Sequence, residues 1–201
     1  MKTAHADAPA SVQSGRERAI GAAYELFSRK GVRAVGVDAV IEEAGIAKAT
    51  LYRNFSSKED LALAFLERRE QRWTQGWLQD EVERRGGTPH ERLLSIFDIF
   101  GEWFARPDFE GCAFVSIMLE LEDRADPVRQ ATVRHLANIR VFVAGLATAA
   151  GVADADGFAR QWHILMKGSI VAAAEGDREA AMRARELGAL LLVQRAAPPV
   201  L

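Results

Sequence analysis

The chain has 201 residues, of which 49% are hydrophobic and 27% are charged, and its formal net charge is −2. This balance indicates a soluble folded protein and excludes both a disordered chain and a strongly basic nucleic-acid binder. Residues 1–62 carry nine Lys or Arg and eight Asp or Glu, a net charge of +1. Any basic surface must therefore come from where the charges lie in space.

The chain has one cysteine, Cys112, and no signal-like segment at its N-terminus. No apolar run approaches the roughly 20 residues that span a membrane. These features predict a cytoplasmic protein with no membrane partner. Residues 1–14 are small and polar and are expected to form a flexible arm.

Three helices are expected in the next part of the chain. Apolar residues recur at helical spacing from Arg16 until Lys30-Gly31, a typical helix end. A short amphipathic segment over 37–44 and a second over 48–54 flank a three-residue turn that contains Gly45. This arrangement predicts a helix-turn-helix.

The rest of the chain also shows helical spacing. A long helix is expected from Ser57 to about Arg84, opened by a capping box that begins at Ser56. Further helices are expected over 90–105, 112–122, 126–150, 154–174 and 177–196, and the first of these is apolar around most of its circumference. No segment alternates with a period of two. The prediction is an all-α fold of about nine helices, with a helix-turn-helix domain over 15–62 and a second helical domain over 63–201.

The segment 48–54 carries side chains suited to DNA. Lys48 can donate to guanine in the major groove, and Thr50 and Tyr52 offer hydroxyls to phosphates. Arg53 and Asn54 add a cation and an amide, while Leu51 and Phe55 are expected in the core. An ordinary solvated lysine and a buried tyrosine remain alternatives for Lys48 and Tyr52.

The stretch from Ala44 to Leu61 closely resembles the DNA-binding signature of the tetracycline-repressor-like (TetR) family, with its glycine turn, Leu-Tyr pair, Phe and Lys-Glu-x-Leu. Residues 22–31 resemble the first helix of that family. Helix two of the family usually opens on Ser or Thr, and here Gly36 stands at that position, a poorer cap. The resemblance implies a DNA-binding site made of Lys48, Ala49, Thr50, Tyr52, Arg53, Asn54 and Lys58.

The resemblance further implies that residues 63–201 bind a small-molecule effector and a second copy of the chain. Aromatic residues and methionines of this domain suggest a pocket for an apolar or aromatic effector, with a packed core as the alternative. His135 could orient a ligand, although a hydrogen-bonded core histidine is the simpler interpretation. The candidate pocket residues are Trp73, Trp77, Phe97, Phe100, Trp103, Phe104, Phe114, Met118, His135, Trp162 and Met166.

One recognition helix reads only a few base pairs, so a homodimer on a palindromic operator is expected. The final two helices carry apolar stripes that could pair with their copies, or could close the core of the monomer. The candidate interface residues are Phe158, Trp162, Leu165, Leu187, Gly188 and Leu191.

No glycine-rich phosphate loop, HExxH, nucleophile elbow or paired cysteine appears, so no enzyme, metal or cofactor is expected. Cys112 could be a redox sensor, but a small buried residue is the simpler interpretation. The function predicted is a ligand-responsive repressor. The alternative is a helical adaptor that binds protein without sequence-specific DNA binding, against which the intact DNA-contact residues argue.

Overall fold

The computed structural model describes residues 14–195, and within this range the regular structure is entirely helical. The described residues form nine helices when the long helix made of three consecutive segments is counted once, which confirms the predicted all-α fold. The predicted flexible arm falls outside the described residues, apart from Ser14. The hydroxyl of Ser14 accepts the backbone N–H of Glu17 and so caps the first helix.

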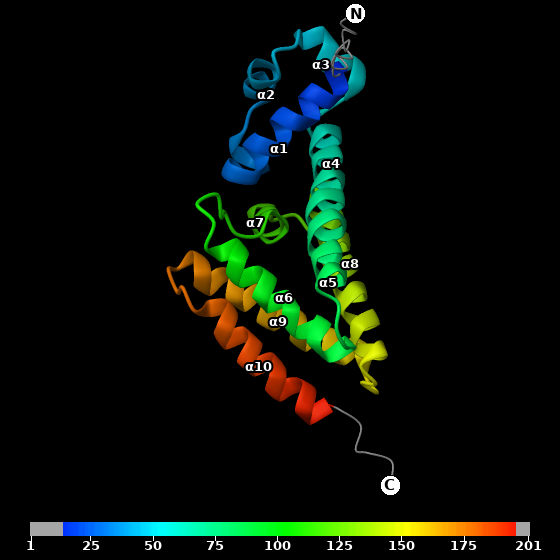
Figure 1. Cartoon of the computed structure of the whole chain (residues 1–201). Helices are drawn as coiled ribbons and strands as arrows, with labels where there is room; N and C mark the ends of the chain where they lie inside the picture. The colour runs from blue at the N-terminus through cyan, green and yellow to red at the C-terminus, as the bar shows by residue number, and fades with distance from the viewer. Residues whose placement is uncertain (1–13, 196–201) are drawn as a thin grey trace, which may run out of the picture.

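The first three helices, α1 (Gly15–Ala34), α2 (Val37–Ala44) and α3 (Lys48–Asn54), form a separate unit at one end of the molecule (Figure 1). Buried apolar residues on all three make its core. The helical conformation of α1 is interrupted at Gly31, whose φ of +78° and ψ of 167° are accessible to glycine and strained for other residues. One further turn follows, so the predicted end at Lys30-Gly31 is a break rather than the last residue of the helix.

A long helix leads from this unit along one side of the molecule and comprises α4 (Lys58–Arg69), η1 (Glu70–Gln79) and α5 (Asp80–Arg85) (Figure 1). Its N-cap is Ser57, whose hydroxyl accepts the N–H of Asp60. The Asp60 carboxylate accepts the N–H of Ser56 and not that of Ser57, so the capping box predicted from Ser56 does not form. The middle segment, η1, is a π-helix of 10 residues. Apolar spacing of three or four indicates an α-helix, and the rare i→i+5 turn has no such local signal, so the sequence predicted an uninterrupted α-helix.

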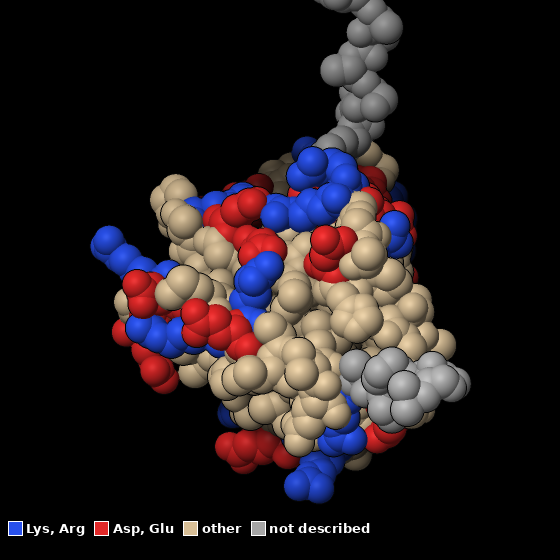
Figure 2. All heavy atoms as spheres, turned by 60° about the horizontal axis from the view of Figure 1, so that its bottom comes forward, with Lys and Arg blue, Asp and Glu red and all other residues tan. Residues whose placement is uncertain are grey.

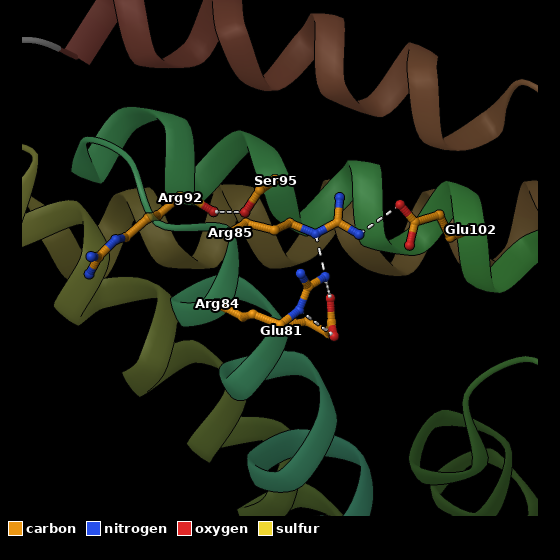
Figure 3. A network of polar contacts seen from close by, with 6 residues as sticks. All are labelled: Glu81, Arg84, Arg85, Arg92, Ser95 and Glu102. Atoms are coloured by element: carbon orange, nitrogen blue, oxygen red, sulfur yellow. Dashed lines mark hydrogen bonds and ion pairs between the residues drawn. The ribbon is translucent and has the colours of Figure 1, made fainter.

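The corner between α5 and α6 (Pro89–Phe104) is held by charged side chains (Figure 3). The guanidinium of Arg85 donates to Glu102 on α6 at 2.7 Å and lies 3.7 Å from Glu81 on its own helix. The next helix begins at Pro89, one residue before its expected range, with Thr88 at the N-cap in a capping box with Glu91. This corner fixes the far end of the long helix against the second domain.

The second domain contains α6 together with α7 (Ala113–Glu120), α8 (Pro127–Ala149), α9 (Ala155–Ala174) and α10 (Ala180–Arg195). Helices α6, α9 and α10 lie side by side, and α7 lies between them and the N-terminal unit (Figure 1). The expectation that the helix over 90–105 is buried on most sides is confirmed, because only four of the sixteen residues of α6 are exposed and the other twelve are buried or half-buried. None of the described helices combines the length and the apolar character that crossing a membrane requires.

Candidate nucleic-acid interface and ligand cleft

Helix α3 is anchored by one face and exposed on the other. Leu51 and Phe55 are buried in the core of the N-terminal unit, as predicted. Lys48, Ala49 and Arg53 are exposed, and the Tyr52 side chain is 47% exposed. The helix therefore presents to solvent most of the residues that the sequence suggested for DNA contact.

A side chain of α1 binds the turn between α2 and α3. The guanidinium of Arg18 donates to the carbonyl oxygen of Gly45 at 3.2 Å, and Gly45 ends α2 in the left-handed conformation. Gly36 at the start of α2 makes no side-chain capping bond, as its lack of a side chain requires. Both helices pack against α1, which therefore helps to set their relative orientation.

Within α3 some of the candidate groups already bond to the protein. The ammonium of Lys48 lies 3.3 Å from Asp38 of α2, in an exposed ion pair. The Asn54 amide donates to the carbonyl of Thr50 at 2.7 Å, and the Thr50 hydroxyl accepts from Arg53 at 3.4 Å. Exposed pairs of this kind contribute little, so Lys48 and Arg53 can exchange their partners for phosphate or base oxygens.

Lys58 lies apart from the other candidates. Its ammonium approaches the carbonyl oxygen of Arg33, 3.4 Å away, at the end of α1. Burial lowers the pKa of Lys58, and the nearby carboxylate of Glu120 opposes that shift. A contact with a helix C-terminus accounts for this cation without the phosphate that the sequence suggested.

A cleft of about 360 Å³ lies between α1, the long helix and the segment that follows α6. Three predicted pocket residues line it, namely Trp73, Trp77 and Trp103, with ring centroids 5.3 to 5.8 Å apart. Its other lining residues were not predicted, and they are mostly polar: Tyr24, Glu25, Ser28, Arg29, Arg69, Arg72, Arg106, Asp108, Glu110 and Gly111. Arg69 lies three residues before Arg72 and four before Trp73, and this helical spacing was the signal in the sequence that could have identified the two arginines.

The remaining aromatic candidates do not line this cleft. Phe97 packs on Trp162, and Phe114 stacks on His135. These four residues, together with Phe100 and Met166, are buried within the core of the second domain, Met118 is half-buried there, and Phe104 packs against Trp103. The packed-core alternative therefore describes these side chains in this structure, because their neighbours fill the space around them.

Two buried histidines have different surroundings. His135 contacts the carboxylate of Glu70 through Nδ1, and the amide of Asn138 donates to the other oxygen of Glu70 at 2.8 Å. Burial lowers the pKa of His135, and the charge of Glu67 opposes that shift. His163 has no hydrogen-bond partner for Nδ1 among the described residues, and burial lowers its pKa to about 3. Both lie in the core, and neither lines the cleft.

The candidate interface residues fall into two groups. Phe158 and Trp162 are fully buried and stacked on each other, and Gly188 is buried beneath Trp162 and Phe97. These three residues pack within the core of this chain and have no exposed surface that a partner could contact. Their assignment to the interface was therefore wrong. Leu165 and Leu191 are half-buried, and Leu187 is 54% exposed.

An apolar strip that includes these leucines runs along α9 and α10. It consists of Ile164, Leu165, Leu187, Leu190 and Leu191. In Figure 2, uncharged surface covers the middle of the face that this end of the molecule presents, and charged side chains lie around it, at the top, the left and the bottom of the view. An apolar surface of this kind is typical of a protein contact.

Cys112, which precedes α7, is buried, and burial raises the pKa of its thiol. A thiol in this environment is a poor nucleophile, since the thiolate is the reactive form. The structure thus favours the small buried residue over the sensor.

Comparison with known proteins assigns both parts of the chain. Residues 19–65 match the family model described as bacterial regulatory proteins of the tetR family, and residues 89–187 match the tetracyclin repressor-like C-terminal domain. The solved structure of a TetR-transcriptional regulator from Streptomyces avermitilis, itself described as putative, is 31% identical, with a TM-score of 0.80 over 91% of this chain and 98% of that one. The TetR-family regulator SCO4454 from Streptomyces coelicolor is 26% identical, with a TM-score of 0.81 over 92% and 91%.

Among curated proteins, the transcriptional repressor KstR of Mycolicibacterium smegmatis is 38% identical over 78 residues, which make up 39% of this chain and 37% of KstR. The chain spans less than half of the length of KstR and of two further curated relatives, one an activator and one a regulator. The two family models together cover most of the chain, in the same order as the two structural domains. The chain belongs to the TetR family of bacterial transcriptional regulators.

Proposed function

We propose that this protein is a repressor that binds a palindromic operator as a homodimer and releases it when a small aromatic effector binds. The observation that carries the proposal is the geometry of α3, which buries Leu51 and Phe55 and exposes Lys48, Tyr52 and Arg53. An anchored helix with exposed donors is what major-groove recognition requires. Since operator DNA is the proposed partner, the proposed location is the cytoplasm, and we assign the protein no catalytic role.

A homodimer would use the apolar strip of α9 and α10, with Leu165, Leu187 and Leu191 as the candidates that remain from the sequence. Two copies would then hold their α3 helices at a spacing near one helical turn of DNA, about 34–36 Å, or a multiple of it. An effector that favours a different spacing would lower operator affinity by shifting the population of conformations.

The test is selection of bound sequences from random duplex DNA by the full chain without added ligand. We expect a palindromic motif. On the selected operator, Lys48→Ala and Tyr52→Phe should weaken binding about five- to tenfold each, because each loses one donor group. The matched control is Arg134→Ala on α8, an exposed arginine far along the chain from α3, which should bind like the parent.

Two results would contradict the proposal. If no sequence is enriched and only weak salt-sensitive binding remains, the adaptor function replaces it. If Lys48→Ala and Tyr52→Phe both bind like the parent, the DNA-contact assignment is wrong even where an operator exists.

A further inference from the structure

The cleft between α1 and the long helix contains three carboxylates, and all three are paired. Glu110 lies 3.1 Å from Arg29, and Glu25 lies 3.6 Å from the same guanidinium. Asp108 accepts two hydrogen bonds from Arg106, at 2.7 and 2.8 Å. The acidic groups of the cleft therefore neutralise Arg29 and Arg106 and leave no carboxylate for the other arginines.

Arg69 and Arg72 are the arginines left over. Neither has a carboxylate within ion-pair distance among the described residues, whereas the adjacent Arg68 pairs with Glu17 at 2.8 Å. Arg69 donates to the hydroxyls of Tyr24 and Ser28, at 3.1 and 3.3 Å. Both guanidiniums lie over the Tyr24 ring, at 5.4 and 5.2 Å from its centroid. Two cations gathered on one ring without a counter-charge favour an anion.

The wall beside these cations is aromatic. Trp73 packs against Trp77 and Trp103, and all three line the cleft. The indole N–H of Trp73 is buried and has no acceptor among the described residues, which is costly unless a partner is present. Flat apolar surface with a few convergent donors is typical of a small-molecule site, and the cleft volume lies at the small end of the range for such sites.

We infer that this cleft binds a small aromatic carboxylate, with the carboxylate on Arg69 and Arg72 and the ring against Trp73 and Trp77. The inference deepens the proposed function, because it names the chemical class of the effector and the place where it binds. Since Arg69 is bonded to Tyr24 and Ser28 of α1, a bound carboxylate competes for the group that joins the long helix to the DNA-binding unit. Occupancy of the cleft would thereby be communicated to α1.

The test is isothermal titration of the full chain with benzoate, salicylate, indole-3-acetate and 1-naphthoate, each beside its neutral amide. We expect at least one acid to bind with a Kd below 1 mM and at least tenfold more tightly than its amide. Arg72→Gln should weaken that acid at least tenfold, while Arg134→Gln, an exposed arginine of α8, should leave it unchanged. Arg72 is exposed, so its replacement should not disturb folding, and circular dichroism would check this.

Binding of no acid, equal binding of acid and amide, or unchanged binding in Arg72→Gln would each overturn the inference. Operator binding is measured in parallel on the same samples without ligand. If the operator is bound and no acid is, the inference alone fails. If an acid is bound in the cleft and no operator is selected, the inference stands as a ligand site and the proposed repressor function fails.

Discussion

Glu120 at the end of α7 accepts hydrogen bonds from both the backbone and the side chain of Arg33 at the end of α1. The Glu120 carboxylate accepts the backbone N–H of Arg33 and that of Val32, the latter at 3.0 Å, and the Arg33 guanidinium donates to the Glu120 carbonyl at 3.1 Å. These contacts join the second domain to the DNA-binding unit 87 residues earlier in the chain. We call this set of bonds the α1–α7 junction.

Replacing Glu120 tests the junction. Glu120→Ala leaves two backbone N–H groups without their acceptor, and each such hydrogen bond contributes roughly 1 kcal/mol. We expect the free energy of unfolding in urea to fall by about 1–2 kcal/mol. Glu122→Ala, at an exposed neighbouring position, should change it by less than about 0.5 kcal/mol. Equal stability of the two variants would show that the junction does not contribute to the fold.

Two glycines of α1 form a matched pair. At Gly31 the φ is +78° and an added Cβ would lie 2.7 Å from the Glu120 carboxylate, whereas at Gly21 an added Cβ meets nothing within 4 Å. Gly31→Ala should destabilise the protein by about 1–3 kcal/mol through backbone strain. Gly21→Ala should stabilise it by about 0.5–1 kcal/mol, since alanine is the better helix former. Thermal denaturation of both variants beside the parent tests this prediction. Melting temperatures that shift in the same direction in both variants would contradict it.

His163 makes stability depend on pH. Burial lowers its pKa from 6.5 to about 3, so between these values the unfolded chain binds a proton that the folded chain does not. Unfolding is therefore favoured as the pH falls from 6.5 toward 3, by at most about 1.4 kcal/mol per pH unit, and this contribution is absent above pH 7.

We expect His163→Leu to show a shallower loss of stability than the parent between pH 7 and pH 5, measured by urea denaturation. His90→Gln, which changes an exposed histidine of α6, should follow the parent. Parallel curves for His163→Leu and the parent would mean that other groups produce the acid sensitivity.

The apolar strip predicts where a second copy binds. Leu187 is 54% exposed on α10, and Val141 is 70% exposed on α8 outside the strip. Leu187→Glu should convert a dimer to a monomer in light scattering after size exclusion, because it buries a charge in the interface. Val141→Glu should leave the dimer intact. A Leu187→Glu protein that stays dimeric would place the interface elsewhere.

The sequence predicted the helices well because local signals define their ends. Helices α6 and α8 begin at Pro89 and Pro127, each within one residue of its expected start, and Gly45 ends α2. It also predicted the exposed face of α3, because Leu51 and Phe55 mark the side of the helix that packs into the core and so leave the opposite side to solvent. Such signals depend only on neighbours along the chain.

Features that depend on distant residues were predicted less well. An apolar stripe shows that Phe158 and Trp162 are buried but not whether their own chain or a second copy covers them. The cleft joins α1 to residues 69–77 and 103–111, and no periodicity relates these segments. Aromatic content suggested Trp73, Trp77 and Trp103, and all three line the cleft, but the paired and unpaired arginines around them become apparent only in three dimensions.

The π-helix η1 makes the shape of the cleft depend on one position. Within it, a Cβ added at Gly76 would lie 2.9 Å from the carbonyl oxygen of Gln71, closer than real side chains come to backbone. A methyl group there cannot fit beside the wide turn, so the helix would have to change its winding between Trp73 and Trp77. Any such change redirects two of the three indoles that face the cleft. The positions of Trp73 and Trp77 in the cleft therefore require glycine at residue 76, although Gly76 does not itself line the cleft.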